Sequence, residues 1–191
     1  MRKALSEREQ HAIKTKLLES CRVCWERYGY KKTGVAQLAS MAGISTGAFY
    51  AFFPSKEMIF IETANAFIQK LYALMAACKP AAPTKYHFVS GFKQCIDEMF
   101  QNPWIFSLRA DIETFLRKLP EDFLEQDFRQ DLLDITAVVN LYGITPKVSM
   151  EEIVAVFHTL LMSIYLTDII GPTHRQALHL LIDSVIGNLF E

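Results

Sequence analysis

The sequence lacks the short motifs that mark the common classes of catalytic site. It contains no G-x-S-x-G nucleophile elbow, no H-E-x-x-H zinc-binding helix, no phosphate-binding glycine loop and no dinucleotide fingerprint. The carboxylates of Glu98, Asp111 and Glu113 show no spacing that acid–base catalysis requires. We therefore expect a protein that is not an enzyme, with no catalytic residues and no cofactor.

Long apolar runs are also absent. Residues 153–170 contain thirteen apolar residues, yet the longest unbroken run in this segment is five residues. The polar residues that interrupt it are His158, Thr159, Ser163, Thr167 and Asp168. A membrane span needs about 20 consecutive, predominantly apolar residues, so we expect none here. The first ten residues, MRKALSEREQ, are charged and lack the apolar run of a signal peptide, so we expect a cytoplasmic protein.

Cysteine is scarce, with four residues in the chain. Cys21 and Cys24 form a C-x-x-C pair, but no second pair and no paired histidines complete a zinc site. Both fall in a predicted amphipathic helix, on the same face as Ile13 and Leu17. We therefore predict buried core cysteines and no metal site, with a redox role for the pair as the alternative.

Net charge is small as well, at −1, which by itself argues against a nucleic-acid-binding protein. The charge is unevenly distributed, however. Residues 1–56 carry ten Lys or Arg against four Asp or Glu, whereas residues 57–191 carry ten against seventeen. A basic N-terminal part and an acidic remainder indicate that only the N-terminal part approaches phosphate groups.

Residues 33–59, TGVAQLASMAGISTGAFYAFFPSKEMI, contain the most informative pattern in the chain. Apolar residues recur at helical spacing in the first part of this segment and give a short helix one apolar face. These residues are Val35, Leu38, Ala39 and Ala42. Gly43 supplies the left-handed residue that ends this helix, and Ser45 is placed to cap a second. Two short helices joined by a tight turn form a helix-turn-helix, whose second helix enters the major groove of DNA.

The rest of the sequence predicts an all-α fold of about nine helices, with no convincing strand pattern. Three capping boxes mark helix starts, at Ser6 and Glu9, at Ser149 and Glu152, and at Thr173 and Gln176. Asn102 is predicted to cap a helix that has Pro103 in its first position. The expected helices cover about 6–28, 35–42, 46–52, 56–77, 85–100, 103–119, 120–141, 150–170 and 173–188.

The two C-terminal helices are rich in apolar residues on all sides. One interpretation is a helix pair buried in a large monomer. A helix that is apolar all round is better explained by two packing partners, its own core and a second subunit. We therefore predict a homodimer, with an interface that includes Val156, Leu160, Ile164, Leu178, Ile182, Val185 and Leu189.

Residues 33–59 resemble the DNA-binding region of TetR-family transcriptional repressors. The matching residues are Thr33, Leu38, Ala39, Ala42, Gly43, Ile44, Ser45, Gly47, Phe49, Tyr50, Phe53 and Lys56. The resemblance implies a DNA-binding domain at residues 1–56 and an effector-binding and dimerisation domain at residues 57–191. It also implies a DNA operator and a small-molecule effector as partners. A protein of the same fold whose body binds a protein partner is the alternative.

Mapped onto this chain, the resemblance implies a recognition helix over about 46–52. The implied DNA contacts come from Thr33, Ser45, Thr46, Gly47, Ala48, Tyr50 and Lys56. Tyr50 and Lys56 would bind phosphates, although a packing role for Tyr50 and a solvated surface position for Lys56 are alternatives. The chain departs from the family pattern at Gly34, Ala36 and Phe52, where members often carry polar or histidine side chains. Thr46 is then the only longer polar side chain in the first turn of the recognition helix.

The resemblance also locates the effector cavity of the family in the C-terminal part of the chain. The residues of this chain that fall there are Trp104, Phe106, Arg109, Phe115, Tyr142, His158 and Met162. Aromatic residues at helical spacing are more often core than pocket lining, so the core assignment stays open for each. An aromatic lining with one arginine predicts an apolar or aromatic effector.

Overall fold

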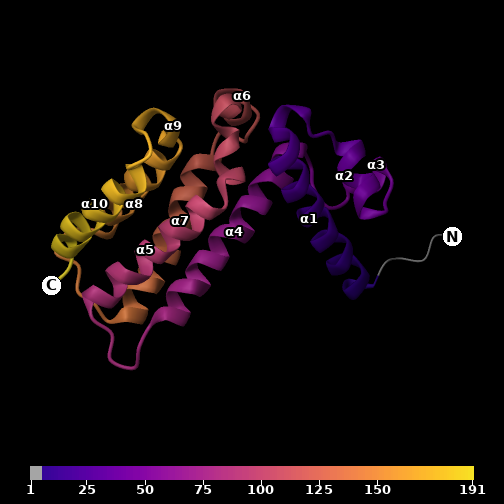
Figure 1. Cartoon of the computed structure of the whole chain (residues 1–191). Coiled ribbons are helices and arrows are strands. Elements are labelled where there is room, and N and C mark those ends of the chain that lie inside the picture. The colour runs from indigo at the N-terminus through magenta and orange to yellow at the C-terminus, as the bar shows by residue number, and fades with distance from the viewer. Residues whose placement is uncertain (1–5) are drawn as a thin grey trace. The chain divides into compact units, whose positions relative to one another are not determined.

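The computed structural model describes residues 6–191, apart from the side chain of Ala110, and it is all-α as predicted (Figure 1). The helices are α1 (Glu7–Lys32), α2 (Val35–Ala42), α3 (Thr46–Phe49), α4 (Lys56–Cys78), α5 (Lys85–Gln101), the 3-10 helix η1 (Pro103–Asp111), α6 (Ile112–Leu116), α7 (Phe123–Tyr142), α8 (Met150–Ile164), α9 (Thr167–Ile170) and α10 (His174–Leu189). Residues 6–191 contain no β-strand, only an isolated bridge between Pro146 and Phe190. Among these residues, no helix is long and apolar enough to cross a membrane.

The helix boundaries agree with the sequence at several caps. The capping boxes at Ser6 and Ser149 are both formed, with Glu9 and Glu152 as the reciprocal partners. The predicted stop at Gly29 is also present, because this residue has φ 73° and ψ 176°, although hydrogen-bonded turns continue α1 to Lys32. Such a backbone conformation favours glycine, since a side chain there would be strained.

Other predicted boundaries are wrong. Thr173 precedes α10 without a side-chain cap bond, so the third capping box does not form. Asn102 ends α5 instead of capping the next helix, because its Nδ2 donates to the Glu98 carbonyl oxygen at 2.9 Å. The segment after Pro103 winds as a 3-10 helix before the short α6. The predicted 150–170 helix breaks at Tyr165 and Leu166, where the amides bond three residues back, to Met162 and Ser163.

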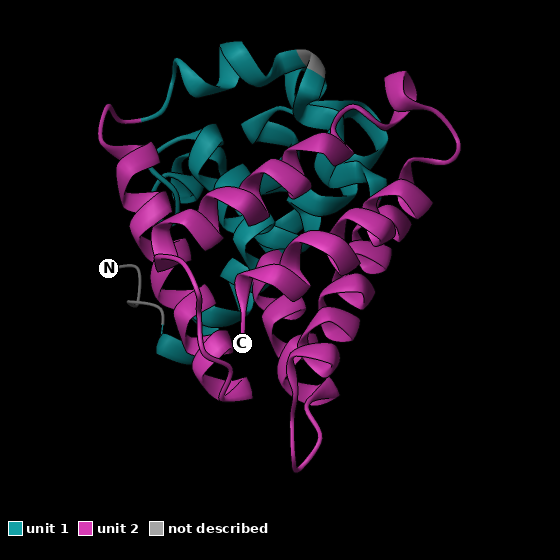
Figure 2. Ribbon diagram, turned by 90° about the vertical axis from the view of Figure 1, so that its left-hand side faces the viewer, with its two compact units in different colours: residues 1–67, 103–119 teal, residues 68–102, 120–191 magenta. Residues whose placement is uncertain are grey.

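The chain forms two compact units, shown in different colours in Figure 2. Unit 1 contains residues 1–67 and 103–119, and unit 2 contains residues 68–102 and 120–191. The helix α4 therefore contributes to both. Each unit is defined by the contacts within it, and the division into functional domains at residue 56 stays a prediction.

In unit 1, α2 and α3 pack together as a helix-turn-helix. Leu38 and Ala39 of α2 and Phe49 of α3 are buried, and Phe53 follows in the same core. Gly43 has φ 76° in the turn, which is the left-handed conformation that the sequence predicts for it. The recognition helix is shorter than the predicted 46–52, because the α-helical pattern ends at Phe49. Ala51 and Phe52 continue with tighter bonds to the carbonyls three residues back.

An aromatic cluster joins α1 to α4, η1 and α6 within unit 1. The Tyr30 ring makes edge contacts with Phe60 and Phe115, each with ring centroids 5.2 Å apart. Trp25 packs on Phe60 at 4.8 Å and on Trp104 at 5.1 Å. Burial of these large rings supplies much of the free energy that holds residues 103–119 on α1.

Tyr30 also takes part in a polar network that is buried at Glu57 and reaches the surface at Lys118. Its hydroxyl donates to Oε1 of Glu57, and Lys118 Nζ lies 3.1 Å from the same hydroxyl and 3.4 Å from the Glu57 carboxylate. Burial tends to raise the pKa of Glu57, but the bond from Tyr30 and the Lys118 charge act against it. The pKa of Glu57 consequently lies below its ordinary value. Burial and the Glu57 carboxylate raise the pKa of Tyr30, so the phenol keeps its proton.

Unit 2 has its own aromatic core. Phe88 of α5 contacts Tyr142 at the end of α7 and Phe190 near the C-terminal end, with ring centroids 5.3 Å apart in both pairs. The Tyr142 hydroxyl donates to the Met75 carbonyl oxygen at 2.8 Å. A Cβ at Gly91 would lie 3.2 Å from the Tyr142 hydroxyl and 3.0 Å from the Met75 sulfur. Glycine at this position therefore permits α4, α5 and α7 to approach closely.

The network around Tyr30 predicts a pH dependence of stability. A carboxyl with a lowered folded pKa stabilises the protein above its unfolded pKa, and the stabilisation is lost as the pH falls through the folded pKa. We expect Glu57→Gln to lower the free energy of unfolding by about 1.5 kcal/mol at neutral pH. The difference from wild type should shrink as the pH falls below the ordinary glutamate pKa.

Urea unfolding at a series of pH values measures this effect. Glu121→Gln is the control, because Glu121 is exposed, and this variant should follow the wild-type curve throughout. A difference between wild type and Glu57→Gln that stays constant with pH would contradict the assignment.

Candidate DNA-binding interface

The first turn of α3 is the most exposed part of the helix-turn-helix. Ser45 caps it, with its Oγ accepting from the Ala48 amide at 3.1 Å. Thr46 and Gly47 are exposed and Ala48 is half-buried. Phe49 lies in the core behind them. The burial pattern thus presents the predicted base-reading residues to solvent on a fixed support.

Tyr50 follows directly after α3 and is 54% exposed. Its ring edge packs against Phe49, with centroids 5.4 Å apart. A tyrosine with its ring supported and most of its surface in solvent is suited to donate a hydrogen bond to a phosphate. The contact itself stays a prediction.

Unlike the exposed Tyr50, Thr33 and Lys56 have side chains that bond backbone carbonyl groups of the protein itself. The Thr33 hydroxyl is buried and donates to the Gly29 carbonyl oxygen at 2.8 Å. Lys56 Nζ donates to the Tyr30 carbonyl oxygen at 2.5 Å and lies 4.1 Å from the centre of the Tyr30 ring. Burial lowers the pKa of Lys56. In this conformation both side chains satisfy carbonyl groups at the end of α1, so their DNA contacts stay predictions.

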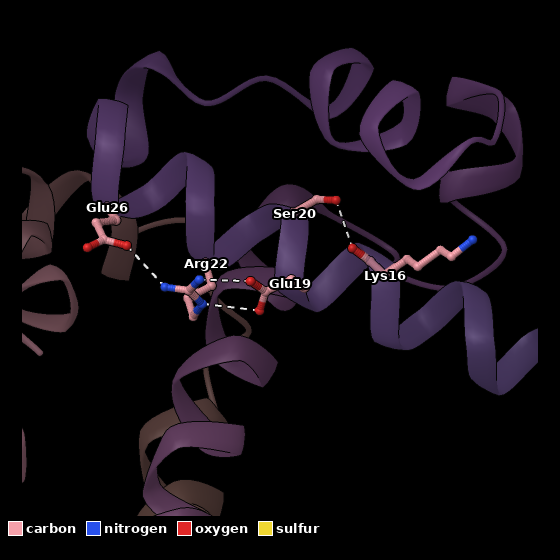
Figure 3. Close-up of polar contacts among 5 residues, drawn as sticks. All are labelled: Lys16, Glu19, Ser20, Arg22 and Glu26. Atoms are coloured by element: carbon pink, nitrogen blue, oxygen red, sulfur yellow. Dashed lines mark hydrogen bonds and ion pairs between the residues drawn. The ribbon is translucent and has the colours of Figure 1, made fainter.

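On α1, Arg22 is paired with two glutamates of the same helix, whereas the Lys16 side chain lies apart from them (Figure 3). Arg22 binds Glu19 at 2.7 Å and Glu26 at 3.0 Å, so this part of the surface is neutralised. The Ser20 hydroxyl donates to the Lys16 carbonyl oxygen at 2.7 Å, and the Lys16 side chain extends away from the ion pairs. The exposed cations of α1 are Arg8, Lys16, Arg27, Lys31 and Lys32. Of these, Lys31 pairs with Asp111 at 2.6 Å.

The C-x-x-C pair in α1 is buried, as the sequence predicts. Cys21 is fully buried, and burial raises the pKa of its thiol to about 12. The Cys24 sulfur lies 3.4 Å from the Met41 sulfur. A thiol that keeps its proton is a poor nucleophile, which argues against a redox role. Residues 6–191 contain no group of three or more side chains that could hold a metal ion.

The predicted pocket residues fall into both units. In unit 1, Trp104 and Phe115 are buried and Phe106 and Arg109 are half-buried. In unit 2, Tyr142 is buried, His158 binds Asp131 at 2.7 Å and Met162 is 57% exposed. No single unit brings all seven together, so the pocket stays a prediction.

The predicted dimer residues lie mostly inside the chain. Leu160 and Ile164 of α8 and Leu178 and Ile182 of α10 are buried in unit 2 itself. Their side chains are therefore not available to a second subunit in this conformation. Val156, Val185 and Leu189 are half-buried.

Other apolar residues of α8, α10 and the intervening segment that contains α9 are exposed, and we refer to them together as the exposed apolar face. They are Met162, Leu166, Ile169, Ile170, Leu180 and Leu181. The sequence contained a signal for α10, because Leu178, Ile182 and Ile186 recur every four residues and define its buried side. Leu180 and Leu181 fall outside that repeat and must lie on another side of the helix.

The N-terminal sequence matches a known family. Residues 17–63, which include the helix-turn-helix, match the family model for bacterial regulatory proteins of the tetR family. A search of curated proteins finds no match to the chain.

Solved structures with this fold include several regulators. A putative TetR-family transcriptional regulator from Rhodococcus sp. aligns with a TM-score of 0.63 and 16% identity, covering 92% of this chain and 99% of the other. SmeT in complex with triclosan aligns with a TM-score of 0.60 and 12% identity, covering 94% of this chain and 92% of SmeT. NalD is the secondary repressor of the MexAB-OprM multidrug efflux pump in Pseudomonas aeruginosa. It aligns with a TM-score of 0.55 and 15% identity, covering 96% of this chain and 98% of NalD. At these identities the alignments show a common fold.

The helix-turn-helix geometry, the family match over it and the common fold lead to one conclusion. Residues 17–63 are a DNA-binding region of the tetR family of bacterial regulatory proteins, and the chain shares its all-α fold with solved structures of TetR-family transcriptional regulators.

Proposed function

We propose that this protein is a homodimeric repressor that leaves its operator when a small apolar or aromatic molecule binds. The observation that carries the proposal is the exposed first turn of α3 above a buried core. Such a repressor acts in the cytoplasm, where a bacterial operator lies. SmeT binds triclosan and NalD represses an efflux pump, and the shared fold supports a ligand-released mechanism here.

Most of the affinity for DNA should come from the phosphate backbone. Arg8, Lys16, Arg27 and Lys32 are exposed cations of α1. The N-cap of α2 is Gly34, which makes no side-chain cap bond, so the first amides of that helix are open to an anion. Contacts of this kind position the protein without reading sequence.

Direct base readout should be sparse. Within α3 itself, Thr46 carries the only polar side chain, because Gly47, Ala48 and Phe49 have no polar group. The small residues allow α3 to approach the bases closely. Specificity at the other operator positions should then come from DNA shape and deformability.

The exposed apolar face of α8, α9 and α10 is the proposed dimer interface. The helices α8 and α10 pack against each other in unit 2 (Figure 1). Two such pairs from two subunits form a four-helix bundle. Six large apolar residues left in solvent by one chain suit a permanent interface with a desolvated centre.

Ligand release follows from linkage between two sites. A ligand releases DNA only if it binds better to a form in which the two DNA-binding heads of the dimer are wrongly spaced. We propose α4 as the coupling element. It begins at Lys56, close behind the recognition helix in sequence, and its 23 residues extend over roughly 35 Å.

The DNA mechanism predicts different effects for two neighbouring residues. Thr46→Ala should change the preferred base at one position of each half-site, because it removes a base contact. Tyr50→Phe should lower the affinity for every operator sequence by about tenfold, because it removes one charge-assisted hydrogen bond to a phosphate. Fluorescence anisotropy with a library of near-palindromic operators at two salt concentrations measures both effects.

Tyr86→Phe is the matched control, since Tyr86 is an exposed tyrosine of α5, and it should bind like wild type. Affinity of the wild type should fall steeply with salt. An unchanged base preference in Thr46→Ala would mean that α3 is not the recognition helix.

The dimer interface predicts that a single charge separates the subunits. Leu180→Glu should raise the dimer dissociation constant at least about a hundredfold, because an unpaired carboxylate would be buried at the interface. Leu133→Glu is the control on α7, with a similarly exposed leucine. Sedimentation velocity at micromolar concentration should show a dimer for wild type and the control. A wild-type monomer would refute the proposed interface.

Ligand release predicts that a compound that stabilises the protein also displaces it from DNA. Triclosan and a library of apolar aromatic compounds are tested first by thermal shift and then by titration of the protein–operator complex. At least one compound should raise the melting temperature and release the DNA at matching concentrations. If no compound in a broad library binds, the alternative with a protein partner is preferred.

A further inference from the structure

The chain has two tryptophans, Trp25 of α1 and Trp104 of η1, and both lie in unit 1 in contact with each other. Their rings meet edge to face, with centroids 5.1 Å apart and planes at 75°. Trp25 is 2% exposed and Trp104 is 5% exposed. Neither indole Nε1 has a hydrogen-bond partner among the described residues.

Two unpaired donors in one buried cluster are unusual. An unpaired buried donor costs about 1–3 kcal/mol, and buried indole N–H groups usually find a partner. An edge-to-face pair can direct at most one N–H at the other ring, which leaves at least one donor unpaired. The neighbouring rings are Phe60 on Trp25 and Phe67 on Trp104, and neither can accept a conventional hydrogen bond.

A buried water is a poor partner for this pair. A water that accepts from one of these indoles would direct its two hydrogens at the surrounding aromatic rings. Buried waters normally make about three hydrogen bonds. An oxygen without hydrogens, on a molecule that is otherwise apolar, satisfies an indole donor and leaves no hydrogen of its own unpaired against the rings.

We propose that Trp25 and Trp104 form a recognition site for an acceptor oxygen of the effector. The ligand class is an aromatic or apolar molecule with a carboxylate, phenolate or carbonyl oxygen. This inference rests on the proposed ligand-released function and specifies its chemistry. The site offers donors only, so it discriminates against molecules whose polar group is a cation or a donor.

The location of Trp25 has a consequence for coupling. Trp25 is part of α1, four residues before the Gly29 bend that leads to α2. A ligand bonded to its indole contacts a helix of the DNA-binding head directly. The two indoles come from segments far apart in the chain, so the ligand also fixes η1 against α1.

The test uses the full-length protein and ultraviolet resonance Raman spectroscopy, whose tryptophan bands report hydrogen bonding of the indole N–H. Because the chain has only these two tryptophans, the signal needs no labelling. In free protein the bands should indicate unbonded N–H groups. Benzoate or acetophenone should shift them to the bonded position, whereas toluene, which has no oxygen, should not.

Variants identify the donors. Trp25→Phe and Trp104→Phe should each weaken binding of the oxygen-bearing probe by about tenfold, because each removes one hydrogen bond to it. Phe67→Leu is the control, since it removes a ring that packs on Trp104 without removing a donor, and it should change binding less than threefold. If either Phe variant fails to fold, replacing tryptophan by benzothienylalanine removes the N–H and keeps the shape.

The outcomes separate this inference from the proposed function. Indole bands already in the bonded position in free protein, or no shift with any oxygen-bearing probe, overturn the inference. If a compound from the library releases DNA equally well from wild type and both tryptophan variants, the ligand-released function stands and this site is wrong. If the compound no longer releases DNA from either tryptophan variant, and both variants keep their affinity for the operator, the result supports the ligand-released function and the tryptophan site.

Discussion

The carbonyl groups at the C-terminal end of α1 determine how the DNA-binding head is assembled. Around the Gly29 bend, two side chains from outside the regular helix bind backbone oxygens of α1, and the Tyr30 oxygen also accepts from the Thr33 amide at 3.3 Å. Thr33 binds the oxygen of Gly29, and Lys56, from the start of α4, binds that of Tyr30. Because these two residues flank the helix-turn-helix in sequence, their bonds fix both of its ends to the same point.

The same point is where residues 103–119 meet the head. Tyr30 contributes its ring to Phe115 and its hydroxyl to Glu57, while Lys118 interacts with both polar groups. Apolar burial supplies most of the free energy, and the polar network makes one arrangement preferable to others, since a misplaced carboxylate would be buried without partners. Conformational changes in residues 103–119 therefore act on α1 and α4 together.

Local signals in the sequence predicted what local physics determines. The helix-turn-helix, the Gly43 turn and the caps at Ser6, Ser45 and Ser149 depend on residues within a few positions of each other, and all are present. The helix type of residues 103–119 could not be predicted in the same way. The choice between an α-helix and a 3-10 helix there depends on packing against α1, which no periodicity in the sequence reveals. The pairing of Trp25 with Trp104 could not be predicted for the same reason, since 78 intervening residues separate them.

The dimer residues show a second limit. Core and interface residues are chemically alike, so apolar spacing alone does not separate residues such as Leu178 and Ile182, which are buried within unit 2, from residues that contact a second subunit. The shortness of α3 has a practical consequence of its own. With one α-helical turn and two side chains no larger than a methyl group, this head should tolerate many base changes but few changes in half-site separation. Genome searches for its binding sites should therefore score the spacing and the groove geometry of inverted repeats before the identity of individual bases.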